Sequence, residues 1–540
     1  MERIRYTLFL LVLLLLSSSV AARTVEIKMS QCPKPFTDNI RQMVAGLNSN
    51  DQVIINFDKS GTYEFDGSIK IRCNTIIKGI STKNTRVIVK EGFANGKSKM
   101  LDDTFFAMHG SSNKKIKVEI KDIAFLLANH KGILWEKAPK HMIKIYYGDG
   151  IVVDNIEMLS DNAAITNLDL RNCSNVLVQN STFENFNNCM LGGCLWSRGY
   201  QKNIVIKNNK FLKYGNDEPL AIWSSDDKKA QLIKNIIVDG NEFIYENKKK
   251  SKNNYNIDVI INFAHYKDEL VNHTCTVSNI VFNNNTITNN AQTKRSIWFH
   301  FDDTAILDTI EVTNNTIRNS SKCQISDGYL TDIIIDTGSK NRGDILISGN
   351  NVYNEAEILC DGKNSGYTFL GVKNGYVNLS NNNIQSNYPV ALVWSHGGYV
   401  SLNLNDNTAS MLYKTAILNS SDNLDKIVIN ANNNEFTGDT RIYCNNIEEL
   451  ELNFTNNTFN SNDYHFFIQE GAATTSIIFD GNTVNALTGK GTMFANYSGN
   501  PCNFKSIRIS NNLFRGISKN DVENAFIRTS RKSISNNIYR

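Results

Sequence analysis

The sequence predicts an all-β fold in which the chain winds as a single-stranded parallel β-helix. Three observations lead to this prediction. A short phrase of alternating apolar residues and an asparagine-rich corner recurs along the chain, its strands are rich in β-branched residues, and the chain holds only six prolines. Alternation with a period of two excludes helical repeats, in which apolar residues recur every three or four positions.

The recurring phrase is clearest at 203–211, 235–243 and 279–287, where it ends in Phe or Ile. The closing apolar residue returns at Phe183, Ile317, Val352, Ile384, Phe436, Phe459, Val484 and Phe514. One such interval is too short for a domain, so each is predicted to form one coil of short strands. Coils stacked at roughly 4.8 Å bury a common apolar core, and the repeat count predicts about a dozen of them.

The asparagines at the corners have a predicted structural role. Asparagine tolerates the left-handed backbone region, and its amide can bond to the same amide one coil above, which makes a ladder. Several corners also match the Asn-x-Ser/Thr sequon, at Asn180, Asn284, Asn314 and Asn456. The structural role is favoured, and glycosylation of these sites stays open.

The first residues predict export. Two arginines precede an apolar run at 8–16, and small residues suited to a signal peptidase follow at 20–22. We therefore expect a signal peptide at 1–22 and one β-helix domain at 23–540, located outside the cell, in a periplasm or on the cell surface. No later apolar run is long enough to predict a transmembrane segment.

Charge and cysteine content narrow the function classes. The formal net charge is +4, and removal of the leader leaves +3, which is close to neutral for 540 residues and argues against nucleic acid as a partner. Ten cysteines are spread thinly, with no spacing typical of zinc ligands. Buried core thiols are favoured over disulfides.

A short amphipathic helix is expected near 37–48, behind a Thr or Asp cap, where it would cover the open end of the core. Its apolar side would consist of Ile40, Met43, Val44 and Leu47. A helix followed by coils of this kind resembles the pectin-lyase-like superfamily of right-handed parallel β-helices. The resemblance covers essentially the whole mature chain and implies that architecture.

The strand before each asparagine phrase predicts a functional face. In 296–303 the residues Trp298, His300 and Asp302 alternate outward, and in 220–227 Trp223 and Asp227 do so. Extending the alignment adds Trp196, Arg198, Asn262, His265, Tyr266, Asp336, Lys373, Trp394 and His396. Aromatic rings stack on sugars, and acids and imidazoles bind hydroxyl groups or move protons, so a polysaccharide is the predicted partner.

The phrase at 215–222 is similar to the Gly-Asp-Asp-x-Ile-Ala-Ile phrase of polygalacturonase-type β-helices. It places Asp217 and Glu218 where that family carries acidic catalytic residues, and His396 lies in a phrase similar to the family's Gly-His-Gly. The family's Asn-Thr-Asp and Arg-Ile-Lys triplets are missing, and His396 lies far downstream. These departures argue against polygalacturonase activity itself.

Hydrolysis is the favoured reaction, because acids outnumber clustered bases on this face. One carboxylic acid would protonate the leaving oxygen and another would activate water, at about 6.5–9.5 Å apart for inversion. Asp227 and Asp302 are the predicted pair, two coils or roughly 9.6 Å apart, and Asp217 or Glu218 could replace either. This reaction needs no cofactor or metal.

Two alternatives stay open. A lyase acting on uronic acids would use Arg198 or Lys373 to neutralise the carboxylate and Tyr266, His265 or His300 as the base. In a lyase, a calcium ion could be held by Asp226, Asp227, Asp302 and Asp303. The other alternative is a non-catalytic glycan-binding or adhesin-like β-helix. The sugar, the linkage and the oligomeric state are not predicted.

Overall fold

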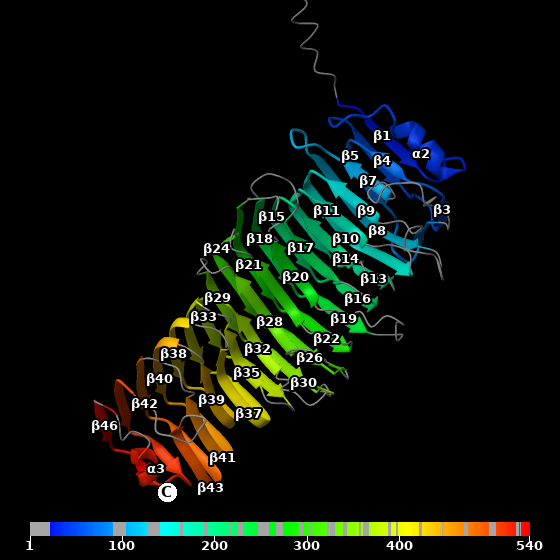
Figure 1. The fold of residues 1–540 in the computed structure, drawn as a ribbon. Coiled ribbons are helices and arrows are strands. Elements are labelled where there is room, and N and C mark those ends of the chain that lie inside the picture. Colours follow the sequence, from blue (N-terminus) through cyan, green and yellow to red (C-terminus); the bar gives the residue numbers. More distant parts are fainter. Residues whose placement is uncertain are drawn as a thin grey trace, which may run out of the picture.

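The computed structural model shows an elongated right-handed parallel β-helix (Figure 1). It describes residues 22–89, 104–127, 141–161, 166–187, 193–215, 218–224, 231–246, 259–265, 274–290, 295–301, 305–320, 323–324, 330–337, 343–355, 358–359, 367–386, 390–395, 398–420, 424–444, 447–468, 474–495, 504–524, 529 and 531–540. The predicted signal peptide lies outside these residues, apart from position 22, and stays a prediction. In the part of the chain that is described, neither helix has the length and hydropathy to cross a membrane.

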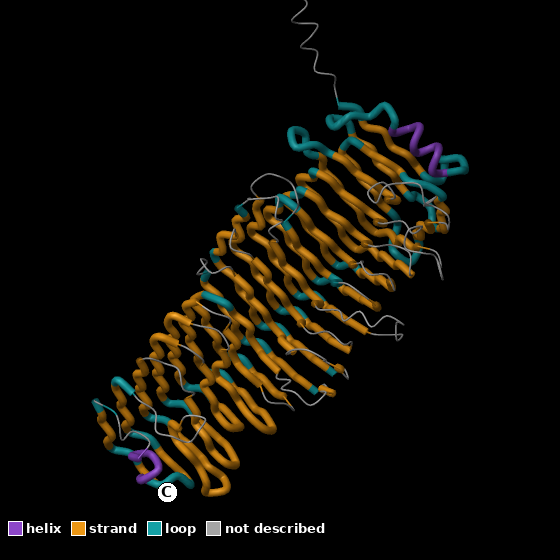
Figure 2. Tube along the Cα trace, viewed as in Figure 1, coloured by secondary structure: helices purple, strands orange, loops and turns teal. Residues whose placement is uncertain are grey.

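Each coil contributes strands to three parallel sheets, which Figure 2 shows as stacked orange rungs. The first sheet contains β1 (Thr24–Lys28), β2 (Gln52–Asn56), β5 (Asn74–Lys78), the first parts of β8 (Ile116–Leu127) and β10 (Gly148–Asp161), β12 (Ser174–Gln179), β15 (Gln201–Lys207), β18 (Gln231–Asp239), β21 (Cys275–Asn283), β24 (Ala305–Leu307), β25 (Thr309–Thr313), β29 (Asp344–Ser348), β33 (Gly375–Ser380), β36 (Gly398–Asn405), β38 (Leu424–Asn432), β40 (Ile447–Thr455), β42 (Thr474–Asp480), β44 (Ser506–Ser510) and β46 (Lys532–Ser535).

The second sheet follows the asparagine corner. It contains β3 (Gly61–Phe65), β6 (Thr85–Val89), the second parts of β8 and β10, β13 (Thr182–Asn187), β16 (Lys210–Gly215), β19 (Glu242–Glu246), β22 (Thr286–Asn290), β26 (Thr316–Asn319), β30 (Asn351–Asn354), β34 (Asn383–Ser386), the first parts of β37 (Thr408–Ser420), β39 (Glu435–Cys444), β41 (Thr458–Ile468) and β43 (Thr483–Ala495), β45 (Leu513–Arg515) and β47 (Ile538–Tyr539).

The third sheet closes each coil and carries the strands predicted to form the functional face. It contains β4 (Ile69–Ile71), β7 (Thr104–His109), β9 (His141–Tyr146), β11 (Thr166–Arg171), β14 (Gly193–Arg198), β17 (Leu220–Trp223), β20 (Val259–His265), β23 (Arg295–Phe301), β28 (Leu330–Thr337), β32 (Tyr367–Val372), β35 (Val390–Ser395) and the second parts of β37, β39, β41 and β43. A separate parallel pair consists of β27 (Cys323–Gln324) and β31 (Ile358–Leu359).

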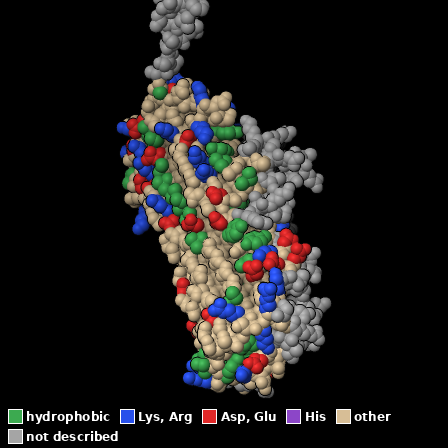
Figure 3. All heavy atoms as spheres, turned by 90° about the vertical axis from the view of Figure 1, so that its left-hand side faces the viewer, with side chains coloured by type: hydrophobic (Ala, Val, Ile, Leu, Met, Phe, Trp, Pro, Cys, Tyr) green, Lys and Arg blue, Asp and Glu red, His purple; other side chains and the backbone are tan. Residues whose placement is uncertain are grey.

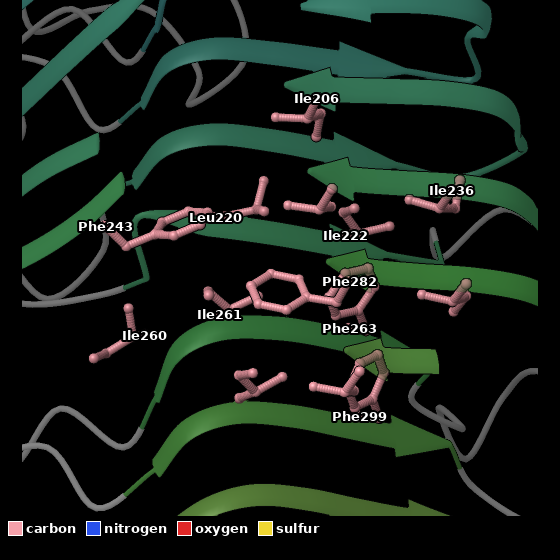
Figure 4. Packing of buried hydrophobic residues seen from close by; sticks show 14 of the residues in the cluster. Ile206, Leu220, Ile222, Ile236, Phe243, Ile260, Ile261, Phe263, Phe282 and Phe299 are labelled. Atoms are coloured by element: carbon pink, nitrogen blue, oxygen red, sulfur yellow. The ribbon is translucent and has the colours of Figure 1, made fainter. Parts of the chain in front are cut away.

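The closing apolar residues of the repeat form one column on the second sheet, as predicted, and all except the half-buried Tyr539 are buried. Its members are Tyr63, Val87, Phe125, Met158, Phe183, Phe211, Phe243, Ile287, Ile317, Val352, Ile384, Ala409, Phe436, Phe459, Val484, Phe514 and Tyr539. There are more coils than the dozen expected, because the first coils lack the asparagine phrase. Phenylalanines of neighbouring coils stack inside, with the rings of Phe211 and Phe243 4.8 Å apart. Figure 4 shows the same kind of packing for Phe263 and Phe299, whose rings lie 4.7 Å apart.

The predicted asparagine ladder is present, and it is buried except at its last member, the half-buried Asn537. In each pair the side-chain Nδ2 donates to the Oδ1 of the asparagine in the next coil, over 2.9–3.2 Å. The ladder contains Asn209, Asn241, Asn285, Asn315, Asn350, Asn382, Asn407, Asn434, Asn457, Asn482, Asn512 and Asn537. Each amide thereby holds two coils together in the core.

The residue before each ladder asparagine adopts the left-handed conformation, also as predicted. Asn284 and Asn314 have φ of 53° and 56°, and glycine occupies the same place at Gly240, Gly349 and Gly481, with φ from 64° to 67°. Asparagine and glycine are the residues that reach this region at least cost. The corner therefore uses two positions, one for the backbone turn and one for the ladder.

The N-terminal helix α2 (Phe36–Val44) lies where a capping helix was expected, but it ends before Leu47, which is partly buried beyond it. Ile40 and Val44 are buried, but Met43 is 43% exposed, because only one side of so short a helix faces the core. The predicted Thr or Asp cap is wrong as well. The helix already begins after Pro35, without a side-chain cap. A second short helix, α3 (Lys519–Asn524), lies near the C-terminus.

Among the residues that the structure describes, five cysteines are buried in the core, which agrees with the favoured prediction. They are Cys32, Cys73, Cys173, Cys194 and Cys275. Burial raises the pKa of Cys173 and Cys194 to about 12, so these thiols stay protonated and unreactive at neutral pH.

The outward column of the first sheet changes character along the helix. It is aliphatic over five consecutive coils and consists of amides further on; these members are Val152, Leu177, Val205, Ile237 and Val281, and then Asn378, Asn403, Asn430 and Asn453. Figure 3 views this side, where hydrophobic and charged side chains gather nearer the N-terminal end and are sparser in the middle of the molecule.

Candidate functional site

The strand register brings the described residues of the predicted face onto the third sheet. Trp196 lies opposite Ala221, Ala221 opposite Asn262, and Asn262 opposite Trp298. A second outward column, two residues further along each strand, contains Arg198, Trp223, Ala264, His300 and Asp336. Trp394 continues the first column, and Lys373 directly follows β32.

Several predicted site residues cannot be placed. Outside the described residues lie Asp217, Asp226, Asp227, Tyr266, Asp302, Asp303 and His396, and for His265 only the backbone at the end of β20 is described. The predicted acid pair and the predicted calcium ligands therefore stay predictions. Among the residues that are described, no group of three His, Cys, Asp or Glu side chains could hold a metal ion.

Two tryptophans and a small residue form the apolar part of the site. The rings of Trp196 and Trp223 lie 5.1 Å apart, beside the fully buried Ala221. Trp196 is only 5% exposed, so it is not the exposed stacking ring that alternation predicted. The guanidinium of Arg198 covers it, 5.4 Å from the ring centre. Trp223 is half-buried and offers the more accessible ring.

Glu218 is the predicted catalytic acid that the structure describes. It precedes β17 by two residues and is half-buried, and its Oε1 accepts a hydrogen bond of 2.9 Å from Nδ2 of Asn262. Asn262 occupies the outward column between Ala221 and Trp298. The contact therefore brings the carboxylate of Glu218 to the tryptophan face.

His300 and Asp336 form a second polar pair on neighbouring strands. Nδ1 of His300 lies 3.0 Å from Oδ2 of Asp336, and both side chains are partly exposed. An ionised carboxylate only accepts hydrogen bonds, so Nδ1 carries the proton and Nε2 of the neutral ring becomes the basic nitrogen. The ring of Trp298 lies 4.9 Å from His300, and Arg295 lies 4.2 Å over that indole.

A buried charge cluster extends this face toward the N-terminus, and the sequence analysis missed it. Asp169 is fully buried and receives Nε and Nη2 of Arg198 at 3.1 and 2.7 Å. Nζ of Lys144 and Nε2 of His141 lie 3.4 and 3.7 Å from the same carboxylate. Lys144 and Asp169 share the column of Trp196, so extending the strand alignment by two coils would have found them.

The cluster keeps the carboxylate of Asp169 ionised, although burial alone would favour its protonated form. Desolvation raises the pKa of Asp169, but the positive groups of His141, Arg198 and Lys144 outweigh it and lower the pKa to about 2. Asp169 is therefore ionised at neutral pH. Through Arg198, it links the charged end of the face to the tryptophan pair.

One open cavity lies away from this face. It has a volume of about 550 Å³ and is lined by Ser49, Asn50, Asn74, Lys115, Lys117, Asp149, Gly150 and Asn175, mainly along the first sheet. It holds no aromatic lining residue and none of the predicted site residues. We therefore place the candidate site on the third sheet.

The solved structures similar to this chain include a glucanase, a polygalacturonase and a surface adhesin. The catalytic unit of a family 87 α-1,3-glucanase from Streptomyces thermodiastaticus is 16% identical, with 77% of this chain and 70% of that chain covered and a TM-score of 0.47. A family 28 exopolygalacturonase from Yersinia enterocolitica is 11% identical, with 82% and 78% covered and a TM-score of 0.38. A surface adhesin of Streptococcus pneumoniae is 11% identical, with 73% and 88% covered and a TM-score of 0.32.

No family model and no curated protein sequence matches the chain. Identities this low carry no statement about activity, and the fold rests on the strand register described above.

Proposed function

We propose that this protein is a carbohydrate-active enzyme that hydrolyses a polysaccharide along the outward face of the third sheet. One observation carries the proposal. The carboxylate of Glu218 is held by Asn262 on the same face as Trp223 and Trp298, which are suited to stack on sugar rings. A linear polymer lying along the helix axis would meet these groups in successive coils.

Glu218 suits the role of the base. The hydrogen bond that Asn262 donates to Oε1 favours the ionised carboxylate, which is the form that activates water. The acid that protonates the leaving oxygen would come from the predicted residues Asp227 or Asp302. In this mechanism Trp223 and Trp298 bind and orient the sugar, and no cofactor takes part.

A lyase is the second candidate, and the pair of His300 and Asp336 favours it. A carboxylate that fixes the imidazole makes Nε2 a directed base, which β-elimination needs for the proton at C5 of a uronic acid. Arg295 and Arg198 lie on the same face and could neutralise the sugar carboxylate. Calcium would act in this reaction only through the predicted acidic residues.

The test is mass spectrometry of products after incubation with neutral and uronic-acid polysaccharides. Wild-type protein is compared with Glu218→Gln, His300→Asn and a control, Glu311→Gln, which changes a half-buried acid on the first sheet. Products that have gained water, lost only with Glu218→Gln, would establish the hydrolase.

Other outcomes point elsewhere. Unsaturated ends, lost with His300→Asn, would establish the lyase. No cleavage of any polysaccharide, with binding retained, would overturn both reactions and favour a glycan-binding protein.

A further inference from the structure

The core contains a column of polar side chains two residues beyond the closing apolar residues. Its members are Ser160, Asn185, Lys213, Tyr245, Asn289, Asn319, Asn354 and Ser386. All of them are buried in an otherwise mainly apolar interior. Lys213 is the one member of this column with a basic side chain, although lysine is almost never fully buried unless it is paired.

Lys213 and Asn185 lie directly opposite each other on the parallel strands β16 and β13. Nζ of Lys213 is 2.7 Å from Oδ1 of Asn185, and both side chains have no exposed surface. Because a C=O bond measures about 1.23 Å, the lysine nitrogen lies at most about 3.9 Å from the amide carbon Cγ. This is close to the separation from which bonds form between held reactants, about 3–3.5 Å.

The amide of Asn185 is fixed in the orientation that this contact requires. Its Nδ2 donates to Oδ1 of Asn167 at 3.1 Å and to the carbonyl oxygen of Gly193 at 3.3 Å. Asn167 is itself held by its own amide, which donates to the carbonyl oxygens of Met158 and Glu184. The carbonyl side of the amide therefore faces Lys213, and the nitrogen faces its own acceptors.

We propose that Lys213 and Asn185 react to form an isopeptide bond between neighbouring coils. The lone pair of Nζ attacks Cγ, a proton passes from Nζ to Nδ2, the Cγ–Nδ2 bond breaks and ammonia leaves. One amide replaces another, so the step needs no oxidant, reductant or further reactant. The fold supplies the proximity, and the neutral form of the amine is the nucleophile.

The bond would brace the strands that carry the candidate site. Cys194 of β14 lies against both partners' strands, with its Sγ 3.6 Å from the carbonyl oxygens of Phe183 and Leu212. Two residues later, β14 carries Trp196. The free thiol of Cys194 forms no disulfide there, so the isopeptide bond would supply the covalent tie at this level.

Intact-mass measurement and peptide mapping of the full mature chain test the proposal. The expected mass is lower than the sequence mass by one ammonia. A tryptic digest should contain a branched peptide that joins the segments around Asn185 and Lys213, without cleavage after Lys213. The map of the wild-type chain is decisive by itself, whether or not any variant folds.

Two variants test which lysine forms the bond. Lys213→Arg should restore the sequence mass, whereas Lys207→Arg, on the first-sheet strand of the same coil, should keep the mass loss and the branched peptide. Linear peptides that end at Lys213 would overturn the proposal. A loss of ammonia without the branched peptide would overturn it too, because another asparagine would then have cyclised.

Discussion

Two columns of side chains run along the helix and differ in nearly every respect. The ladder asparagines are identical from coil to coil, neutral and buried in the core. The outward column of the third sheet changes at each step, through Lys144, Asp169, Trp196, Ala221 and Asn262. An amide both donates and accepts, so identical rungs satisfy one another, whereas charges must alternate with unlike neighbours. The repeated asparagines of the ladder thus hold the coils together, whereas the varied outward column is where we place the candidate site.

The largest effect is expected for a substitution in the varied outward face, at the proposed catalytic residue Glu218. Glu218→Gln should lower the rate of polysaccharide cleavage by about 10²–10⁴-fold, because it removes a proton-transfer group. The amide keeps the shape of the carboxylate, so the thermal unfolding midpoint should stay near that of the wild type. Initial rates and circular dichroism measure the two quantities. An unchanged rate would remove Glu218 from the mechanism.

The charge cluster should contribute more to stability than a single rung of the ladder does. Asp169→Asn leaves Lys144 and Arg198 without their buried counter-charge, which should lower the free energy of unfolding by about 3–5 kcal/mol. Glu242→Gln is the control, since its pair with Lys210 is exposed and should contribute little. Urea unfolding compares them. Equal midpoints for both variants would show that the cluster is not a stabilising centre.

Removal of one ladder asparagine should lower the free energy of unfolding somewhat less. Asn315→Ala removes the Oδ1 that accepts from both the backbone N–H and Nδ2 of Asn285. Buried donors without an acceptor cost about 1–3 kcal/mol each, so we expect a loss of about 3 kcal/mol. Asn403→Ala, in the outward amide row of the first sheet, should change little. Similar losses in both variants would contradict a special role for the buried ladder.

Acid should erase the contribution of Asp169. Its pKa is lowered to about 2 from 3.8, so the unfolded chain binds the proton more readily, and the stabilisation is present above about pH 4. It amounts to about 2 kcal/mol and is lost as the pH falls through 2. The stability difference between wild type and Asp169→Asn should therefore shrink from about pH 4 to about pH 2. A constant difference would contradict this assignment.

The smallest loss of stability is expected at the left-handed residue of an asparagine corner. Asn314 has φ of 56°, so Asn314→Ala should cost about 1–2 kcal/mol, because alanine enters the left-handed region with difficulty. Asn314→Gly should be close to neutral, as glycine already fills this place at Gly349. Thermal unfolding compares the two variants. Equal destabilisation would mean that the side chain of Asn314, not its backbone, matters.

Sequence predicted the fold well because each coil repeats the same local signals. The alternation that ends at Phe211, the left-handed turn at Asn208 and the ladder amide of Asn209 occur together in one short phrase, and the structure shows all three. The exceptions are informative. Ala409 closes a coil without a large apolar residue, so pattern searching passed over that coil.

The candidate site was predicted only in part, because its contacts join side chains that never recur. Alternation correctly placed His300 and Asp336 on one face, but their contact depends on the register between two coils. The burial of Trp196 depends on Arg198, and Arg198 depends on Asp169, which lies a coil away. A local sequence pattern such as alternation cannot predict contacts that depend on one another across coils.

The ladder also gives the molecule a direction. The backbone N–H and the Nδ2 of Asn241 both donate to Oδ1 of Asn285, and the same Nδ2 donates to the carbonyl oxygen of Ile206 in the preceding coil. The side-chain amide of each ladder asparagine therefore has one acceptor in the preceding coil, which is already folded, and gains a second acceptor when the following coil folds. Such an array can grow by templated addition from the N-terminal end, with each new turn locking the one before. If the predicted signal peptide directs export, the chain would cross the membrane in that order, and each new coil would hinder it from slipping back.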